Sequence, residues 1–182
     1  SAFSDFSPST PAHLIARIGN DERGQYFTNN TSPRLGDLQV DKVEPTGIAL
    51  SVLNNDGSLV VRRRFFGAAS NAIVSKEEQE EKNSLFVTDL FTIKNQKTHE
   101  QAQLMMMSVA NLGGIFALNL GGMNPVNGTP EELSQTLSGM HTQPNFTIGN
   151  ESEYKYLTGK EEVTEIIEDV FPASDIVIIT RG

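Results

Sequence analysis

The segment GGMNPVNGTP, residues 121–130, carries the groups best suited to hold a ligand. Five of its residues offer backbone N–H groups, carboxamides or a hydroxyl: Gly121, Gly122, Asn124, Asn127 and Thr129. An expected strand precedes the segment and a helix follows it, and ligands of open α/β sheets bind beyond the carboxyl ends of strands. Glu131 and Glu132 already occupy the positive end of that helix, which disfavours a phosphate. A neutral, small polar ligand or a protein edge fits better, and a plain structural loop is the alternative.

Charged residues inside two expected strands are the second group of candidates. Asp89 shares a strand face with apolar residues, and a half-buried carboxylate needs a partner. Residues 62–64 are three consecutive arginines, so strand alternation sends at least one to each face. Either the strand lies at a sheet edge or one arginine reaches a carboxylate. The other hypothesis is that Asp89 and Arg63 bind the small polar ligand.

The sequence lacks the residues that most other kinds of catalytic or metal site require. The chain has no cysteine, which excludes disulfides, thiolate metal sites and cysteine nucleophiles. His13, His99 and His141 are isolated and have no metal-ligand spacing. Ser138 and His141 stand near each other without a nucleophile-elbow motif, and no phosphate-binding glycine motif occurs. The sequence therefore predicts no catalytic residue, no metal and no cofactor, and argues against an enzyme.

The charge balance disfavours a nucleic-acid partner. The formal net charge is −9, and affinity for nucleic acid comes largely from lysines and arginines that displace counterions. The acidic residues of segment 76–84 form a solvated face or a site for a basic protein partner.

The long uncharged stretch between Glu100 and Glu131 is expected to be protein core. A membrane helix needs about 20 mainly apolar residues. Glycine pairs at 113–114 and 121–122 interrupt this stretch, and a helix-interior glycine costs about 1 kcal/mol relative to alanine. We therefore expect a buried helix, a glycine cap, a core strand and an exit turn, with no membrane insertion.

The N-terminal half shows the alternation of short strands. A hairpin is predicted at NNDG, residues 54–57, because these residues tolerate the positive φ of a tight turn. Strands are expected at 13–18, 25–28, 37–40, 47–53 and 58–66.

After residue 84 the sequence pattern predicts alternating strands and helices. Thr98, Thr129 and Thr158 are predicted helix N-caps, the second of them followed by a proline at the first helical position. Strands are expected at 85–93, 115–120 and 175–180, and helices at 99–111, from 130 and at 160–171.

These patterns predict an α+β fold with an antiparallel β-rich N-terminal half and an α/β half that contains a βαβ unit and about three main helices. The expected organisation is an extended arm at 1–12, a β-rich subdomain at 13–66, a polar boundary at 67–84 and an α/β subdomain at 85–182.

The stretch SPRLGDLQVDKVEPTGIALSVLNNDGSLVVRRRF, about a third of the chain, resembles the small β-domains of pilus and type II secretion inner-membrane linker proteins. In those domains a turn ending in Gly-Asp precedes two strands and a hairpin. The resemblance implies a periplasmic linker domain. Nothing after residue 70 continues it.

Three functions follow from these observations. The first is a non-enzymatic structural or binding subunit of a viral, phage or cell-envelope assembly, with a protein partner or self-association. The second is an enzyme or sensor that binds a small polar ligand over 121–130, and the third is the periplasmic linker domain. A soluble protein of the cytoplasm or a virion is favoured over a disulfide-forming secreted one.

Overall fold

The computed structural model describes residues 14–31, 38–57, 59–82, 84–123, 128–140, 142–170 and 174–181. The chain divides into two compact units, Ser1–Ile73 and Val74–Gly182. Each unit is described by itself.

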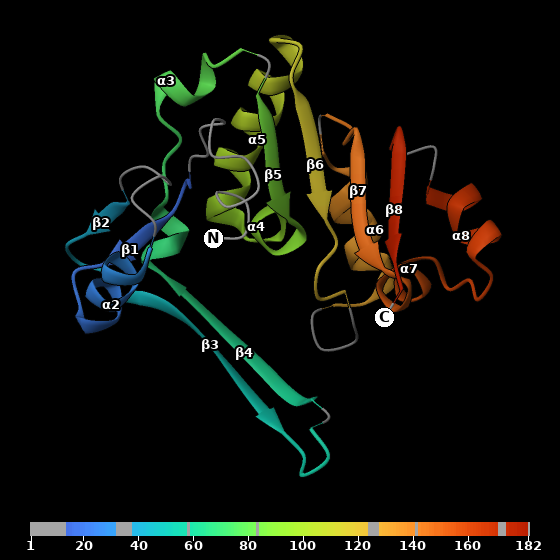
Figure 1. The fold of residues 1–182 in the computed structure, drawn as a ribbon, viewed down its shortest axis with the longest axis horizontal. Coiled ribbons are helices and arrows are strands. Elements are labelled where there is room, and N and C mark those ends of the chain that lie inside the picture. The colour runs from blue at the N-terminus through green and yellow to red at the C-terminus, as the bar shows by residue number, and fades with distance from the viewer. Residues whose placement is uncertain are drawn as a thin grey trace. The chain divides into compact units, whose positions relative to one another are not determined.

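The described part of the first unit contains two pairs of strands, one α-helix and a short 3₁₀ helix (Figure 1). Strands β1 and β2 pair in parallel, and β3 and β4 form a long antiparallel ribbon. Its elements are β1 (Arg17–Gly19), α2 (Glu22–Asn30), β2 (Gln39–Asp41), β3 (Thr46–Leu53), β4 (Leu59–Gly67) and the short 3₁₀ helix η2 (Ala68–Asn71).

The ribbon confirms the predicted hairpin at residues 54–57, where Gly57 has a φ of +84°. One of its faces carries exposed apolar side chains, because Leu50, Val52 and Phe65 are 58%, 45% and 59% accessible. Both strands of a two-stranded ribbon are edges. Arg63 lies opposite Leu50 and is exposed, which agrees with the edge position of the two alternatives for the arginine run.

The expectation of an antiparallel β-rich N-terminal half is wrong. Residues 25–28 lie inside helix α2, and the β1–β2 pair is parallel. Asp21 caps α2, since its Oδ1 accepts a hydrogen bond from the Gly24 N–H at 2.8 Å. The aromatic pair Tyr26–Phe27 suggested a strand, but the aspartate cap and the packing of Gly24 against β1 stabilise a helix.

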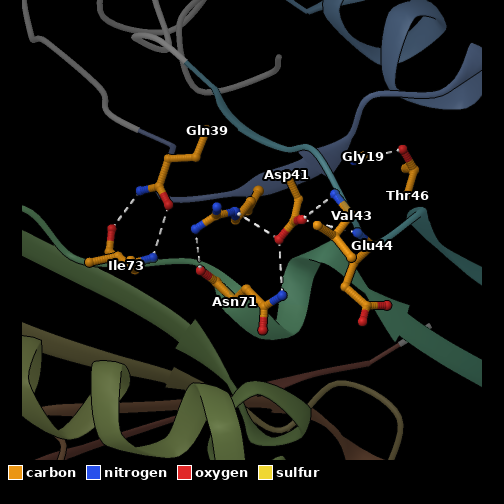
Figure 2. A network of polar contacts seen from close by, with 9 residues as sticks. Gly19, Gln39, Asp41, Val43, Glu44, Thr46, Asn71 and Ile73 are labelled. Carbon is orange, nitrogen blue, oxygen red and sulfur yellow. Dashed lines mark hydrogen bonds and ion pairs between the residues drawn. The ribbon is translucent and has the colours of Figure 1, made fainter.

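Asp41 is the centre of a polar network that joins β2 to η2 (Figure 2). It accepts hydrogen bonds from the backbone N–H groups of Val43 and Glu44 and from the side chain of Asn71, all at 2.9–3.0 Å. Arg17 Nε lies 3.2 Å from Asp41 Oδ2 as an ion pair. The Glu44 N–H, followed by Asn71 and the Val43 N–H, lowers the pKa of Asp41 from 3.8 to about 2.

This lowered pKa predicts an acid-sensitive first unit. Because Asp41 holds its proton more weakly in the folded state, its stabilising effect is complete above about pH 4 and is lost as pH falls towards 2. We expect Asp41→Asn to be less stable than the wild type at pH 7 and this difference to shrink below pH 3, as measured by thermal unfolding. A difference that is constant from pH 7 to pH 2.5 would contradict the role given to the carboxylate.

The second unit is built on a four-stranded sheet in the order β5-β6-β7-β8, with every pair parallel (Figure 1). Its strands are β5 (Leu85–Asp89), β6 (Ile115–Asn119), β7 (Phe146–Asn150) and β8 (Ile176–Thr180). Its helices are α3 (Lys76–Gln79), α4 (Leu90–Lys94), α5 (Gln96–Asn111), α6 (Pro130–Ser138), α7 (Glu151–Thr158) and α8 (Val163–Val170).

Helices cover one face of this sheet. The core of the unit joins β6 residues Phe116 and Leu118 to one buried residue or more from each of α4 to α8, among them Met106 and Tyr154. Consecutive strand order explains the arrangement, because right-handed crossovers between neighbouring strands all lie on the same side. The residues that alternate with the core positions, such as Leu85, Ile115 and Ile176, are 42–54% exposed.

The uncharged stretch is core, as its glycines indicated. It forms most of α5 and all of β6, separated at Gly113–Gly114, and Met106 and Leu118 are fully buried. The expected βαβ unit is present, but the strand predicted at 85–93 ends at Asp89 and helix α4 follows at once. Within the described residues, no helix combines the length and the apolar character required to cross a bilayer.

Candidate functional site

The carboxyl ends of the four parallel strands carry a row of polar side chains. These four residues, here called the polar edge, are Asp89, Asn119, Asn150 and Thr180. Asp89 is in register with Asn119, and Asn150 with Thr180. This end of an open parallel sheet is where α/β proteins bind their ligands.

The turn after β6 is fixed by side chains of the unit itself. The Gly121 N–H donates to Asn119 Oδ1 at 2.8 Å, and the Gly122 N–H donates to Glu153 Oε1 at 2.5 Å. Gly122 has a φ of +86°, a conformation that L side chains rarely adopt. Both glycine amides expected to face a ligand are thus bonded within the protein.

Glu153 ties this turn to the end of β7. Its Oε2 accepts the Asn150 N–H at 2.9 Å, while Asn150 Oδ1 accepts the Glu153 N–H at 2.9 Å, so the two residues form the capping box of α7. Glu153 is only 8% exposed. A buried carboxylate that accepts two backbone N–H groups is well satisfied, and here it links neighbouring strands of the polar edge.

Strand β7 and helix α7 pack closely at Gly149 and Tyr154. A Cβ on Gly149 would lie 3.1 Å from the Tyr154 ring and 3.2 Å from Leu120 Cβ. Tyr154 is fully buried and donates its hydroxyl hydrogen to the Thr147 carbonyl at 2.8 Å. Burial, helped by the charge of Glu153, raises the pKa of Tyr154 above its ordinary value, so the phenol is a neutral structural donor.

A chain of opposite charges runs beside the edge. Arg181, the residue after β8, pairs with Glu151 at 3.1 Å, Glu151 pairs with Lys155 at 3.2 Å, and Lys155 pairs with Glu161 at 3.2 Å. Hydrogen bonds to Glu151 and then Glu161 raise the pKa of Lys155. The guanidinium of Arg181 thus lies at the carboxyl end of the sheet, paired with Glu151 and largely exposed.

The predicted site residues are distributed over both units. Asp89 Oδ1 accepts the Thr92 N–H at 2.8 Å and caps α4, and Thr129 Oγ1 accepts the Glu132 N–H at 3.3 Å and caps α6. Hydrogen bonding by its own N–H and by Thr129 lowers the pKa of Glu131 in the first turn of α6. Arg63 belongs to the first unit.

Asn124 and Asn127 lie outside the described residues. Among the residues that are described, no three His, Cys, Asp or Glu side chains come together to form a metal site.

Sequence reasoning missed β7 and α7, and with them Asn150 and Glu153. Their signal was the sequence FTIGNESE, an apolar run followed by Asn-x-x-Glu. An asparagine followed three residues later by a glutamate is a helix-capping signal at the end of a strand.

The comparisons with known proteins identify the fold. No protein-family model and no curated protein matches the sequence. Among solved structures, fructokinase from Vibrio cholerae with fructose, ADP and calcium bound has a TM-score of 0.73 at 19% identity, and covers 96% of this chain and 58% of its own. The chain shares the fold of this kinase.

Two other solved structures show the same fold. Adenosine kinase from Sinorhizobium meliloti has a TM-score of 0.74 at 13% identity, with 96% of this chain and 54% of the kinase covered. A PfkB protein from Polaromonas has a TM-score of 0.76 at 16% identity, with 96% and 62% covered. The chain therefore spans between 54% and 62% of the length of these proteins.

These neighbours correct the predicted fold class and the predicted function. The fold class is α/β with a central parallel sheet, not α+β with an antiparallel half. The non-enzymatic assembly subunit and the argument against an enzyme are wrong, because the neighbours include a fructokinase and an adenosine kinase. The periplasmic linker and the ligand-binding loop at 121–130 have no support in them either.

Proposed function

We propose that the chain belongs to a kinase that transfers a phosphoryl group from a nucleoside triphosphate to a hydroxyl group of a sugar or nucleoside. The observation that carries the proposal is the polar edge of the parallel sheet, in a fold shared with a fructokinase and an adenosine kinase. The substrate hydroxyl attacks the terminal phosphorus, the bond to the bridging oxygen breaks, and the nucleoside diphosphate leaves.

The polar edge is suited to orient a hydroxylic substrate and a phosphate chain. Asn119 and Asn150 are exposed, and the NH₂ groups of their carboxamides can donate hydrogen bonds to sugar hydroxyls. Arg181 supplies a cation beside them, and a guanidinium matches phosphate geometry. Catalysis of phosphoryl transfer depends mainly on such positioning and charge stabilisation.

Kinases of this chemistry use a divalent cation with the nucleotide. The described residues contain no cluster of three candidate ligands, which fits a magnesium ion held mainly by phosphate oxygens and water, with one or two carboxylates. Asp89 is the carboxylate of the polar edge that would contribute an oxygen. Its Oδ1 is engaged by the Thr92 N–H.

A nucleotide-binding experiment tests the proposal at residue level. Titration of ¹⁵N-labelled protein with ATP and Mg²⁺ is expected to shift the amide signals of Leu120, Asn150 and Arg181 at the carboxyl ends of the strands. The amides of Ser84 and Asn145, at the opposite ends of the same sheet, are the internal control. Shifts confined to the control end, or none at millimolar ATP, would refute the proposal.

Activity is then measured as ADP formation in the presence of fructose, ribose or adenosine. We expect one acceptor class to raise ADP formation at least tenfold over the acceptor-free blank. Asp89→Asn is the informative variant, because asparagine also caps helices and so preserves α4 while it removes the carboxylate. A role of Asp89 in metal binding predicts a raised Mg²⁺ requirement at unchanged thermal stability.

A further inference from the structure

The turn of the β3–β4 ribbon contains Asp56–Gly57, the only Asp–Gly step in the sequence. Both residues are exposed, and the turn lies at the end of the ribbon farthest from β1, β2 and η2 (Figure 1). A Cβ placed on Gly57 would meet no packed atom within 4 Å. Open space thus surrounds the Cα of Gly57, and the residue has no side chain to shield its peptide nitrogen.

A turn hydrogen bond restrains this nitrogen. The Gly57 N–H donates to the Asn54 carbonyl at 3.0 Å. The strand pairing beside the turn is irregular, because the register shifts between Val52 and Leu53. A two-stranded ribbon has only marginal stability of its own, and exposed tips open at low free energy. We therefore expect the turn bond to break often while the rest of the first unit stays folded.

We propose that Asp56 is a site of spontaneous isoaspartate formation in the folded protein. Once the turn bond is broken, the Gly57 nitrogen attacks Cγ of the protonated Asp56 carboxyl and closes a five-membered succinimide. The carboxyl hydroxyl leaves as water together with the hydrogen of the Gly57 nitrogen, so a C–N bond replaces a C–O bond. Water then opens the ring at either carbonyl carbon and gives aspartate or isoaspartate. The reaction is a net isomerisation that needs no oxidant, and it is independent of the proposed kinase activity.

Isoaspartate changes the path of the main chain through the turn. The peptide bond to Gly57 then starts from Cγ, so the Cβ methylene enters the backbone and the former α-carboxyl becomes a free carboxylate. The extra backbone atom disturbs the strand register that the turn sets. We expect the pairing of Leu53 with Leu59 beside the turn to loosen, while Thr46 and Gly67 at the base of the ribbon stay paired.

Incubation of the purified protein at pH 7.4 and 37 °C tests the proposal. Isoaspartate is measured in the tryptic peptide of residues 43–62 by liquid chromatography and electron-transfer fragmentation, which assigns the isomer to a residue. In H₂¹⁸O each newly formed isomer carries ¹⁸O, which separates it from isomers present at purification. We expect isoaspartate to accumulate at Asp56 at least tenfold faster than at Asp21 or Asp41, which are followed by a glutamate and a lysine.

Two substitutions at the same position are the matched variants. Asp56→Glu keeps the charge but requires a six-membered ring, so we expect no isomer at residue 56. Asp56→Asn loses ammonia more readily than aspartate loses water, so we expect isoaspartate to form at least tenfold faster. Protected amides in β1 and β2 show that each variant is folded.

The role of the fold is tested by the same incubation in about 6 M urea, which unfolds the chain. We expect the rate at Asp56 in the folded protein to lie within about tenfold of the unfolded rate, because the tip opens readily. A folded rate that is lower by more than this factor would show that the turn bond protects the Gly57 nitrogen, and would overturn the proposal. Assignment of the isomer to Asn54 or Asn55 instead of Asp56 would overturn it as well.

Discussion

Glu153→Gln is expected to lower the free energy of unfolding of the second unit by about 2–3 kcal/mol, since hydrogen bonds to a buried charged acceptor contribute about 1.5–3 kcal/mol each. The carboxylate accepts from the N–H groups of Gly122 and Asn150 on its two oxygens. A glutamine offers one acceptor oxygen and turns an NH₂ group towards the other N–H. One buried donor then faces a second donor.

The control for this substitution is Glu132→Gln, which changes the same position of a capping box. Glu132 accepts the Thr129 N–H at 3.3 Å in α6, but its side chain is 58% exposed. Water can therefore take the place of the carboxylate oxygen as the acceptor for this N–H. We expect a loss below about 1 kcal/mol. Denaturant unfolding of both variants decides the comparison, and equal losses would show that Glu153 acts only as a helix cap.

Gly24→Ala is expected to destabilise the first unit by about 3 kcal/mol or more, although alanine is the better helix former by about 1 kcal/mol. A Cβ on Gly24 would lie 2.0 Å from the Gly19 carbonyl oxygen, a backbone atom of β1 that cannot move without the strand. Helix α2 would have to lift away from β1, and the Asp21 cap with its bond to Thr46 would be disturbed.

Gly139→Ala tests whether the loss at Gly24 comes from this contact. Gly139 ends α6 with a φ of −78°, and the nearest atom to an added Cβ is the Gln135 carbonyl oxygen at 3.3 Å. We expect a change within about 0.5 kcal/mol of zero there. If thermal unfolding shows the same small change for Gly24→Ala, the close packing of α2 on β1 is wrong.

The sequence revealed the parts of the fold that depend on local patterns. The hairpin at 54–57, the helix N-cap at Thr129 and the division of the uncharged stretch by Gly113–Gly114 all follow from residues close in the chain, and the structure confirms them. Helix α2 was missed because its short sequence has few apolar residues to mark a helical face, and a tertiary contact at Gly24 fixes it.

The candidate site was harder to predict because its residues come together only through strand register. Asp89 was noticed as a charge within a strand, whereas it ends that strand in register with Asn119. Gly121 and Gly122 were expected to offer free amides. The Gly121 N–H instead donates to Asn119 two residues earlier, and the Gly122 N–H donates to Glu153 on α7, a pairing that leaves no trace in the local sequence. The parallel order of four strands, not a motif, defines the polar edge.

The consecutive strand order of the second unit has a consequence for how it forms. Each strand pairs with the one made just before it, so a growing chain closes only short loops at each step. The β5–α5–β6 segment can begin to form while β7 and β8 are still in the ribosome. Each later strand can then pair with the edge of a strand that has already folded. We therefore expect the amides of β5 and β6 to gain protection before those of β7 and β8 while the chain is being synthesised.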